Sequence, residues 1–158
     1  MVNTGHNVPV SGFRVRAALA ILSTGLVLCG CASPAWSDAS YHGKAIRSAQ
    51  EMSSAVATAR IAAEQYLDGR LTPPAADTIV SDAEQDAQGV LSAFETRQPP
   101  DASSRQLFEA VDPILQQAAN AITDLRMALR ADDRSGISSA QHDLGTVSPK
   151  LQRLAGQS

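Results

Sequence analysis

The chain has 158 residues and a formal net charge of −3, with 16 acidic against 13 basic residues, and its length fits one domain with a short segment added at one end. Nucleic-acid binding and adhesion to anionic lipid both need clustered positive charge, so we expect no nucleic-acid partner and no basic lipid-binding patch. Both cysteines, Cys29 and Cys31, lie near the N-terminus, so the remainder of the chain cannot hold a disulfide framework, a cysteine-ligated metal or a cysteine nucleophile.

The N-terminal segment combines positive charge with a short apolar run. Arg14 and Arg16 precede the apolar run Ala17–Gly30. This run has about 14 residues, fewer than the roughly 20 that a helix needs to cross the hydrocarbon core of a membrane. The order of charge and apolar residues is typical of an export signal peptide. An uncleaved anchor helix and a signal peptide without lipid attachment are the two alternatives that the sequence leaves open.

The apolar run ends in the motif Leu28-Cys29-Gly30-Cys31. This motif resembles the lipobox of bacterial lipoproteins, which has an aliphatic residue, a tolerant position, a small residue and then the cysteine. The resemblance implies that signal peptidase II cleaves before Cys31 and that Cys31 carries diacylglycerol through a thioether. It also implies a protein that is held by lipid on the extracytoplasmic face of the cell membrane.

This interpretation divides the chain into three parts. Residues 1–30 are a cleaved signal peptide, residues 31–40 are the lipidated cysteine with a flexible tether, and residues 41–158 are the folded domain. Removing residues 1–30 takes away Arg14 and Arg16, so 11 basic residues (13 − 2) face 16 acidic ones and the net charge becomes −5.

Four segments of the domain repeat apolar residues at alternating spacings of three and four, which places one apolar row on each of four helices. In the first two segments the rows are Ala45, Ala49, Met52, Val56, Ala59, Ala63, Tyr66, and then Ala76, Val80, Ala83, Ala87, Val90, Phe94. In the last two they are Phe108, Val111, Leu115, Ala118, Ile122, Leu125, Leu129, and then Ile137, Ala140, Leu144, Val147, Leu151, Leu154. Short connections favour antiparallel neighbours, so we predict an all-α fold, an up-down antiparallel four-helix bundle.

Glycine and proline separate the four segments. Gly69 is placed to end the first helix in the left-handed conformation, and Thr72 precedes a proline at the first helical position of the second. Residues 132–136 are expected to form the last turn. Pro113 and Pro149 fall on the outward side of the third and fourth helices. We predict that they kink these helices; the alternative is that each proline starts a new short helix.

The sequence offers no catalytic constellation. It lacks the Glu-x-x-His pairs of di-iron bundles, the Cys-x-x-Cys-His of covalent haem, the Gly-x-Ser-x-Gly of hydrolases and a glycine-rich phosphate loop. Met52 lies on an apolar row, but His142 is expected to point outward, which argues against haem. Asp82, Glu84 and Asp86 lie inside a helical pattern in which Asp82 and Asp86 share a face and Glu84 points elsewhere, so we expect a solvated helix face rather than a metal site. We therefore predict no enzyme activity, no cofactor and no metal site.

Arg126, Arg130 and Arg134 stand four residues apart near the end of the third helical segment. Cations there are favoured by the negative end of the helix dipole, and this structural role suffices to explain them. We also hypothesise that they bind an acidic partner. The leading functional expectation is a membrane-anchored, non-enzymatic helical module that binds another component of the cell envelope. The alternative is a bundle that binds a small ligand or a lipid between its helices.

Overall fold

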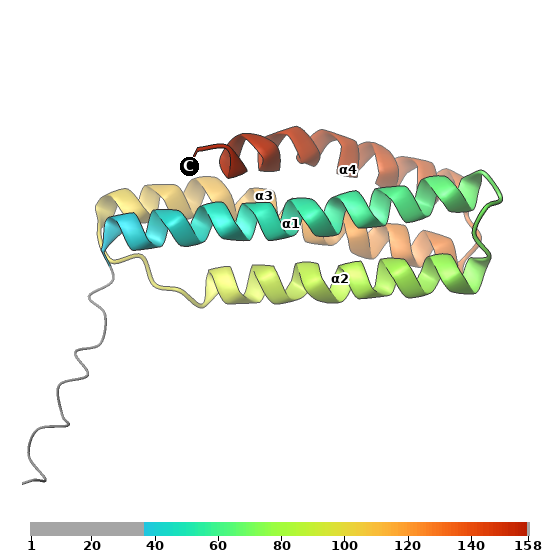
Figure 1. The fold of residues 1–158 in the computed structure, drawn as a ribbon, viewed down its shortest axis with the longest axis horizontal. Coiled ribbons are helices and arrows are strands. Elements are labelled where there is room, and N and C mark those ends of the chain that lie inside the picture. The colour runs from blue at the N-terminus through green and yellow to red at the C-terminus, as the bar shows by residue number, and fades with distance from the viewer. Residues whose placement is uncertain (1–36, 158) are drawn as a thin grey trace, which may run out of the picture. The chain divides into compact units, whose positions relative to one another are not determined.

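The computed structural model describes residues 37–157, which form four helices and no strand. The helices are α1 (Asp38–Leu67), α2 (Pro73–Glu95), α3 (Ala102–Arg130) and α4 (Arg134–Ala155). Successive helices run antiparallel and pack side by side (Figure 1), so the predicted all-α four-helix bundle is confirmed. Within this part of the chain, no helix is both long and apolar enough to cross a membrane.

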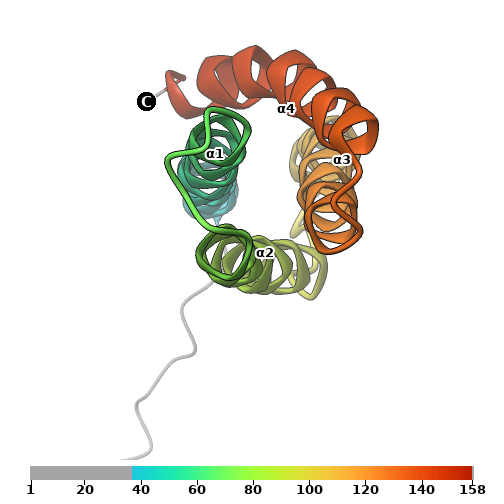
Figure 2. The same ribbon diagram turned by 90° about the vertical axis from the view of Figure 1, so that its right-hand side faces the viewer.

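The four helices surround one core, with α1 diagonally opposite α3 and α2 diagonally opposite α4 (Figure 2). Helix α1 contacts all three other helices, whereas α2 and α4 do not contact each other. The cross-section is therefore short along the α1–α3 diagonal and long along the α2–α4 diagonal. Because every neighbouring pair is antiparallel, the starts of α1 and α3 lie at the same end of the bundle as the ends of α2 and α4. We call this the N-terminal end.

Alanine explains the short diagonal. Helix α1 buries alanines along most of its length, and α3 buries Ala118, Ala119 and Ala121, so the two backbones approach with little side-chain volume between them. Alanine removes little apolar area from water, so the hydrophobic stabilisation depends on the few large buried side chains. The largest fully buried ones are Tyr41, Phe94, Met52, Leu115, Ile122, Leu125, Ile137, Leu144 and Leu151.

The predicted apolar rows face this core, except that Val90, Phe108 and Leu154 are only half-buried. Helix α1 begins at Asp38, because the Ser37 side chain accepts a hydrogen bond from the backbone N–H of Ser40 and caps the helix. The expectation that the tether extends to residue 40 is therefore wrong at its last three residues.

Both internal prolines are exposed and lie inside continuous helices. Pro113 is part of α3 and Pro149 is part of α4. On the outward side, a proline ring and the backbone carbonyl that loses its partner both face water, which lowers the cost of interrupting the hydrogen-bond ladder. The alternative that each proline starts a new helix is wrong.

The connection between α3 and α4 is tighter than expected. It consists of Ala131, Asp132 and Asp133, with Asp132 in the left-handed region at φ 50°. The Asp133 side chain caps α4, and a Cβ on Gly136 would lie 2.7 Å from its carboxylate, so a larger residue there would displace the capping side chain. The predicted turn over residues 132–136 is therefore wrong at its C-terminal side, where Arg134 already begins α4. In the connection between α1 and α2, Gly69 adopts the predicted left-handed conformation, with φ 72°.

Candidate binding surface

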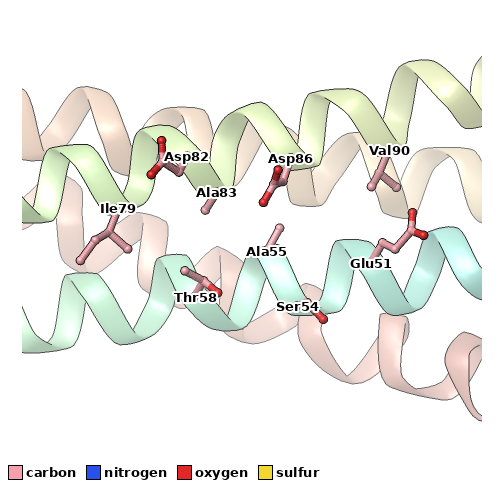
Figure 3. Close-up of a pocket in the computed structure, with 9 residues that line it drawn as sticks. All are labelled: Glu51, Ser54, Ala55, Thr58, Ile79, Asp82, Ala83, Asp86 and Val90. Atoms are coloured by element: carbon pink, nitrogen blue, oxygen red, sulfur yellow. The ribbon is translucent and has the colours of Figure 1, made fainter.

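A groove of about 490 Å³ runs along the outer side of the bundle between α1 and α2. Its apolar lining comes from Ala55 of α1 and from Ile79, Ala83 and Val90 of α2. Figure 3 shows Ala55 pointing toward α2, and Ala83 and Val90 pointing toward α1. Because alanines occupy the middle of the groove on both helices, no large side chain fills it. We call this hollow the α1–α2 groove.

Two side-chain rows border the α1–α2 groove in register. On α1 the lining residues Glu51, Ser54 and Thr58 are spaced by three and four, and Ile61 is the next position of this row beyond the lining. On α2 the lining residues Ile79, Asp82, Asp86 and Val90 are spaced by three, four and four. In an antiparallel hairpin, residues equally far from the turn face each other. The facing pairs are therefore Glu51 with Val90, Ser54 with Asp86, Thr58 with Asp82, and Ile61 with Ile79.

The borders of the groove are acidic, and an exposed isoleucine follows its lining on α1. Glu51, Asp82 and Asp86 are exposed, and none of them makes an ion pair or a side-chain hydrogen bond within residues 37–157. Ile61 is 59% exposed, one of two large hydrophobic residues with such exposure in the described part of the chain. The groove thus presents apolar surface beside carboxylates that form no ion pair within residues 37–157.

Positive charge collects beside the groove, toward the N-terminal end of the bundle. Lys44 and Arg47 of α1 and Arg97 of the α2–α3 connection line an adjoining hollow, which shares Glu51 with the groove. The surface over α1 and α2 therefore changes from basic, to acidic, to apolar along the direction of α1. The sequence alone did not indicate this order, because the three basic residues come from two distant segments.

The structure places the three predicted partner-binding arginines in different surroundings. Arg126 is largely buried between α2 and α3, with Nε 2.5 Å from the Glu84 carboxylate, although its N–H group is not directed at any acceptor. Arg130 pairs with Asp77 through a 3.0 Å contact. Arg134 is the first residue of α4 and is exposed. The expectation of one row on the third helix is therefore wrong for Arg134.

The structure largely agrees with the orientations predicted for the three acidic residues of α2 and for His142. Asp82 and Asp86 share an exposed side of α2, whereas Glu84 points elsewhere and is largely buried against Arg126. The expected solvated face is therefore formed by two of the three acids. His142 is exposed and Met52 is buried in the core. Among the described residues, no group of three or more histidine, cysteine, aspartate and glutamate side chains could hold a metal ion.

A second concentration of interactions lies at the N-terminal end of the bundle. Phe94 stacks on Phe108 with ring centroids 5.4 Å apart and an interplanar angle of 7°, and the Tyr41 ring lies 6.3 Å from Phe94. The buried Ser104 hydroxyl donates a 2.8 Å hydrogen bond to Asp38, which links the start of α3 to the start of α1. These contacts fix the point at which α1 enters the fold.

Polar groups near this aromatic cluster are incompletely paired. The Tyr41 hydroxyl and Asp112 Oδ1 are buried and have no hydrogen-bond partner among the described residues. Burial raises the pKa of Asp112, and the Glu95 carboxylate raises it further. Burial also raises the pKa of Tyr41, against a smaller lowering by Arg97. The fold therefore disfavours the charged form of Asp112, so the ionised side chain destabilises the folded protein.

The lipobox residues Leu28, Cys29, Gly30 and the lipidation candidate Cys31 lie outside the described residues, as does the signal peptide over residues 1–30. Those predictions therefore stay predictions. No protein-family model, curated protein or solved structure matches this chain significantly.

Proposed function

We propose that this protein is a lipid-anchored, extracytoplasmic module that has no catalytic role and binds another component of the cell envelope through the side of its helical bundle. The observation that carries the proposal is the α1–α2 groove, in which apolar surface lies beside the exposed carboxylates of Glu51, Asp82 and Asp86. An exposed apolar surface bordered by polar residues is a common property of protein-binding sites.

The N-terminal sequence supports the anchoring part of the proposal. The charged and apolar segment ends at Leu28-Cys29-Gly30-Cys31, and helix α1 starts shortly afterwards at Asp38. Lipid attachment contributes about 0.8 kcal/mol per buried CH₂ group, so that two or three acyl chains hold a protein durably at a membrane. Between Cys31 and Asp38 the chain can extend at most about 3.5 Å per residue, so the bundle would stay close to the bilayer.

The length of α1 gives the groove a definite place in such an arrangement. At 1.5 Å of rise per residue, positions 51–58 lie about 20 to 30 Å along α1 from its start at Asp38. An upright bundle would therefore present the groove beyond the lipid headgroups, where a neighbouring envelope protein can reach it.

A second candidate function is the binding of a small ligand or lipid. Its support is the volume of the groove, about 490 Å³, which falls within the range of about 300 to 1,000 Å³ for small-molecule sites. A ligand that remains bound through purification would distinguish this function from partner binding.

In-cell cross-linking with lipidation controls tests the leading proposal. A photoreactive side chain is placed in turn at four exposed positions on different helices, Ser54, Ser92, Asn120 and Ser139. We expect a covalent adduct with a second envelope component from at least one position. We also expect Cys31→Ala to leave the membrane fraction and to lose the adduct. The absence of an adduct at all four positions, or unchanged membrane retention of Cys31→Ala, would overturn the proposal.

A further inference from the structure

We infer that the occupant of the α1–α2 groove is an amphipathic helix of a partner protein, with basic side chains beside its apolar row. This inference rests on the proposed binding function and adds the chemistry of the partner. Three features of the groove carry it: the length of the groove, the arrangement of its apolar positions and its exposed carboxylates.

The dimensions of the groove suit a helix. The lining of the groove extends from Ile79 to Val90 on α2, which corresponds to about 16 Å or three helical turns. Alanines form the middle of the groove, and Ile79 and Val90 provide apolar contact at its two ends. A third helix lying along two antiparallel helices would insert its side chains between the two rows, in the helix-in-groove mode of recognition.

The charges select a basic partner. Asp82 and Asp86 are four residues apart, so they project from successive turns of α2 about 6 Å apart. Lysine or arginine residues at the same spacing on a docked helix would meet both carboxylates. At an interface such pairs steer association and select the partner, because an acidic helix would be repelled from the same surface.

Neighbouring cations limit how far the basic part of the partner can extend. Lys44, Arg47 and Arg97 adjoin the groove beyond Glu51 and would repel a further basic residue there. We therefore expect a partner whose basic residues cover about three turns and do not continue toward the N-terminal end of the bundle. This order disfavours a uniformly basic polymer. The carboxylates likewise disfavour an anionic lipid surface.

The test uses a designed peptide and a matched pair of variants. The probe is a synthetic helix of about 18 residues, long enough to form a helix, with leucines at 3,4 spacing and lysines beside them over the central three turns. A second peptide replaces each lysine by glutamate, and polylysine is the third probe. Binding to the full chain is measured by fluorescence anisotropy at about 0.15 M salt, where charges beyond about 8 Å are screened.

The variant Asp82→Lys/Asp86→Lys reverses the charge of the groove. The control Asp124→Lys/Asp143→Lys makes the same change in net charge at two exposed acids on the α3–α4 side, across the bundle from the groove. Thr58→Trp blocks the exposed border of the groove without changing its charge. All substituted positions are exposed, so we expect each variant to retain the wild-type circular dichroism spectrum.

We expect the lysine peptide to bind the wild type, and both groove variants to weaken binding about tenfold or more, against less than about twofold for the control. Equal weakening by the two charge reversals, or equal binding of the glutamate peptide or of polylysine, would overturn the inference. Cross-linking from Asn120 or Ser139 but not from Ser54 would also overturn the inference. The proposed function would survive this result, because a partner would still be bound through another side of the bundle. Failure of the peptide test with an adduct at Ser54 would mean that the groove binds a partner of different chemistry.

Discussion

Truncation of Phe94 should remove an unusually large share of the stability of this bundle. The chain has three phenylalanines, two tyrosines and one tryptophan, and three of these aromatic residues meet at the N-terminal end. Phe94 is 1% exposed and stacks on Phe108 at 5.4 Å. In a core made largely of alanine, few neighbours can move to fill the space that its ring would leave.

The expected cost follows from the loss of the ring and from the cavity that remains. Phenylalanine-to-alanine changes at buried sites cost about 3 to 5 kcal/mol, against a total stability of about 5 to 15 kcal/mol for a typical domain. We place Phe94→Ala at about 4 kcal/mol. Phe94→Leu keeps most of the volume but loses the aromatic stacking, so it should cost about 1 to 1.5 kcal/mol.

Urea unfolding followed by circular dichroism at 222 nm measures both variants against the wild type. Phe108→Ala is the internal comparison, because Phe108 is only half-buried and should cost less than Phe94→Ala. The slope of the free energy of unfolding against urea concentration should be the same for all four proteins, so that their unfolding midpoints can be compared directly. A cost below about 1 kcal/mol for Phe94→Ala would refute the packing argument.

Three further predictions concern polar residues. Asp101→Ala should lower the melting temperature by about 2 to 5 °C, because the Asp101 side chain caps α3. Hydrogen bonds lower the pKa of Asp101, so the difference in melting temperature between wild type and variant should shrink in acid, where Asp101 becomes protonated. Asp112→Asn should stabilise the fold near pH 7, because the pKa of Asp112 is raised in the folded protein. This gain in stability should vanish below pH 3.8, the ordinary pKa of aspartate, where Asp112 is protonated in both the folded and the unfolded chain. Scanning calorimetry at neutral and acidic pH measures both effects, and a gain that persists in acid would contradict the argument for Asp112. Glu84→Ala should cost about 2 kcal/mol because it leaves Arg126 unpaired between α2 and α3, and adding Arg126→Met should restore at least half of this loss in urea unfolding.

The apolar repeats of the sequence predicted the helices well because most leucine, valine and isoleucine residues are buried in the core or packed against it. Alanine was less informative. Ala62 and Ala121 are buried although they lie off the predicted rows, whereas Ala57 and Ala110 are exposed. An alanine fits both inside and outside a bundle, so its position alone could not show which helices approach closely. The short α1–α3 diagonal therefore emerged only from the structure.

The candidate site was harder to predict because it depends on the pairing between helices. The spacing of Asp82 and Asp86 predicted a shared exposed side, but not that Glu51 and Ala55 would face them across a groove. Glu84 and Arg126 are 42 positions apart (126 − 84), and only the packing of α2 on α3 brings them together. The four-residue spacing of the arginines also did not show that Arg134 already begins α4, because such a step does not distinguish one helix from two.

The most direct test of the account is the intact mass of the protein extracted in mild detergent from a bacterial host, measured together with Cys31→Ala. We predict a mass that starts at Cys31 and includes diacylglycerol, and we predict that the lipid is missing from the variant. An additional mass that remains bound would favour the ligand-binding function over partner binding. An unmodified mass that retains residues 1–30 would contradict the lipid anchor on which the proposed function depends.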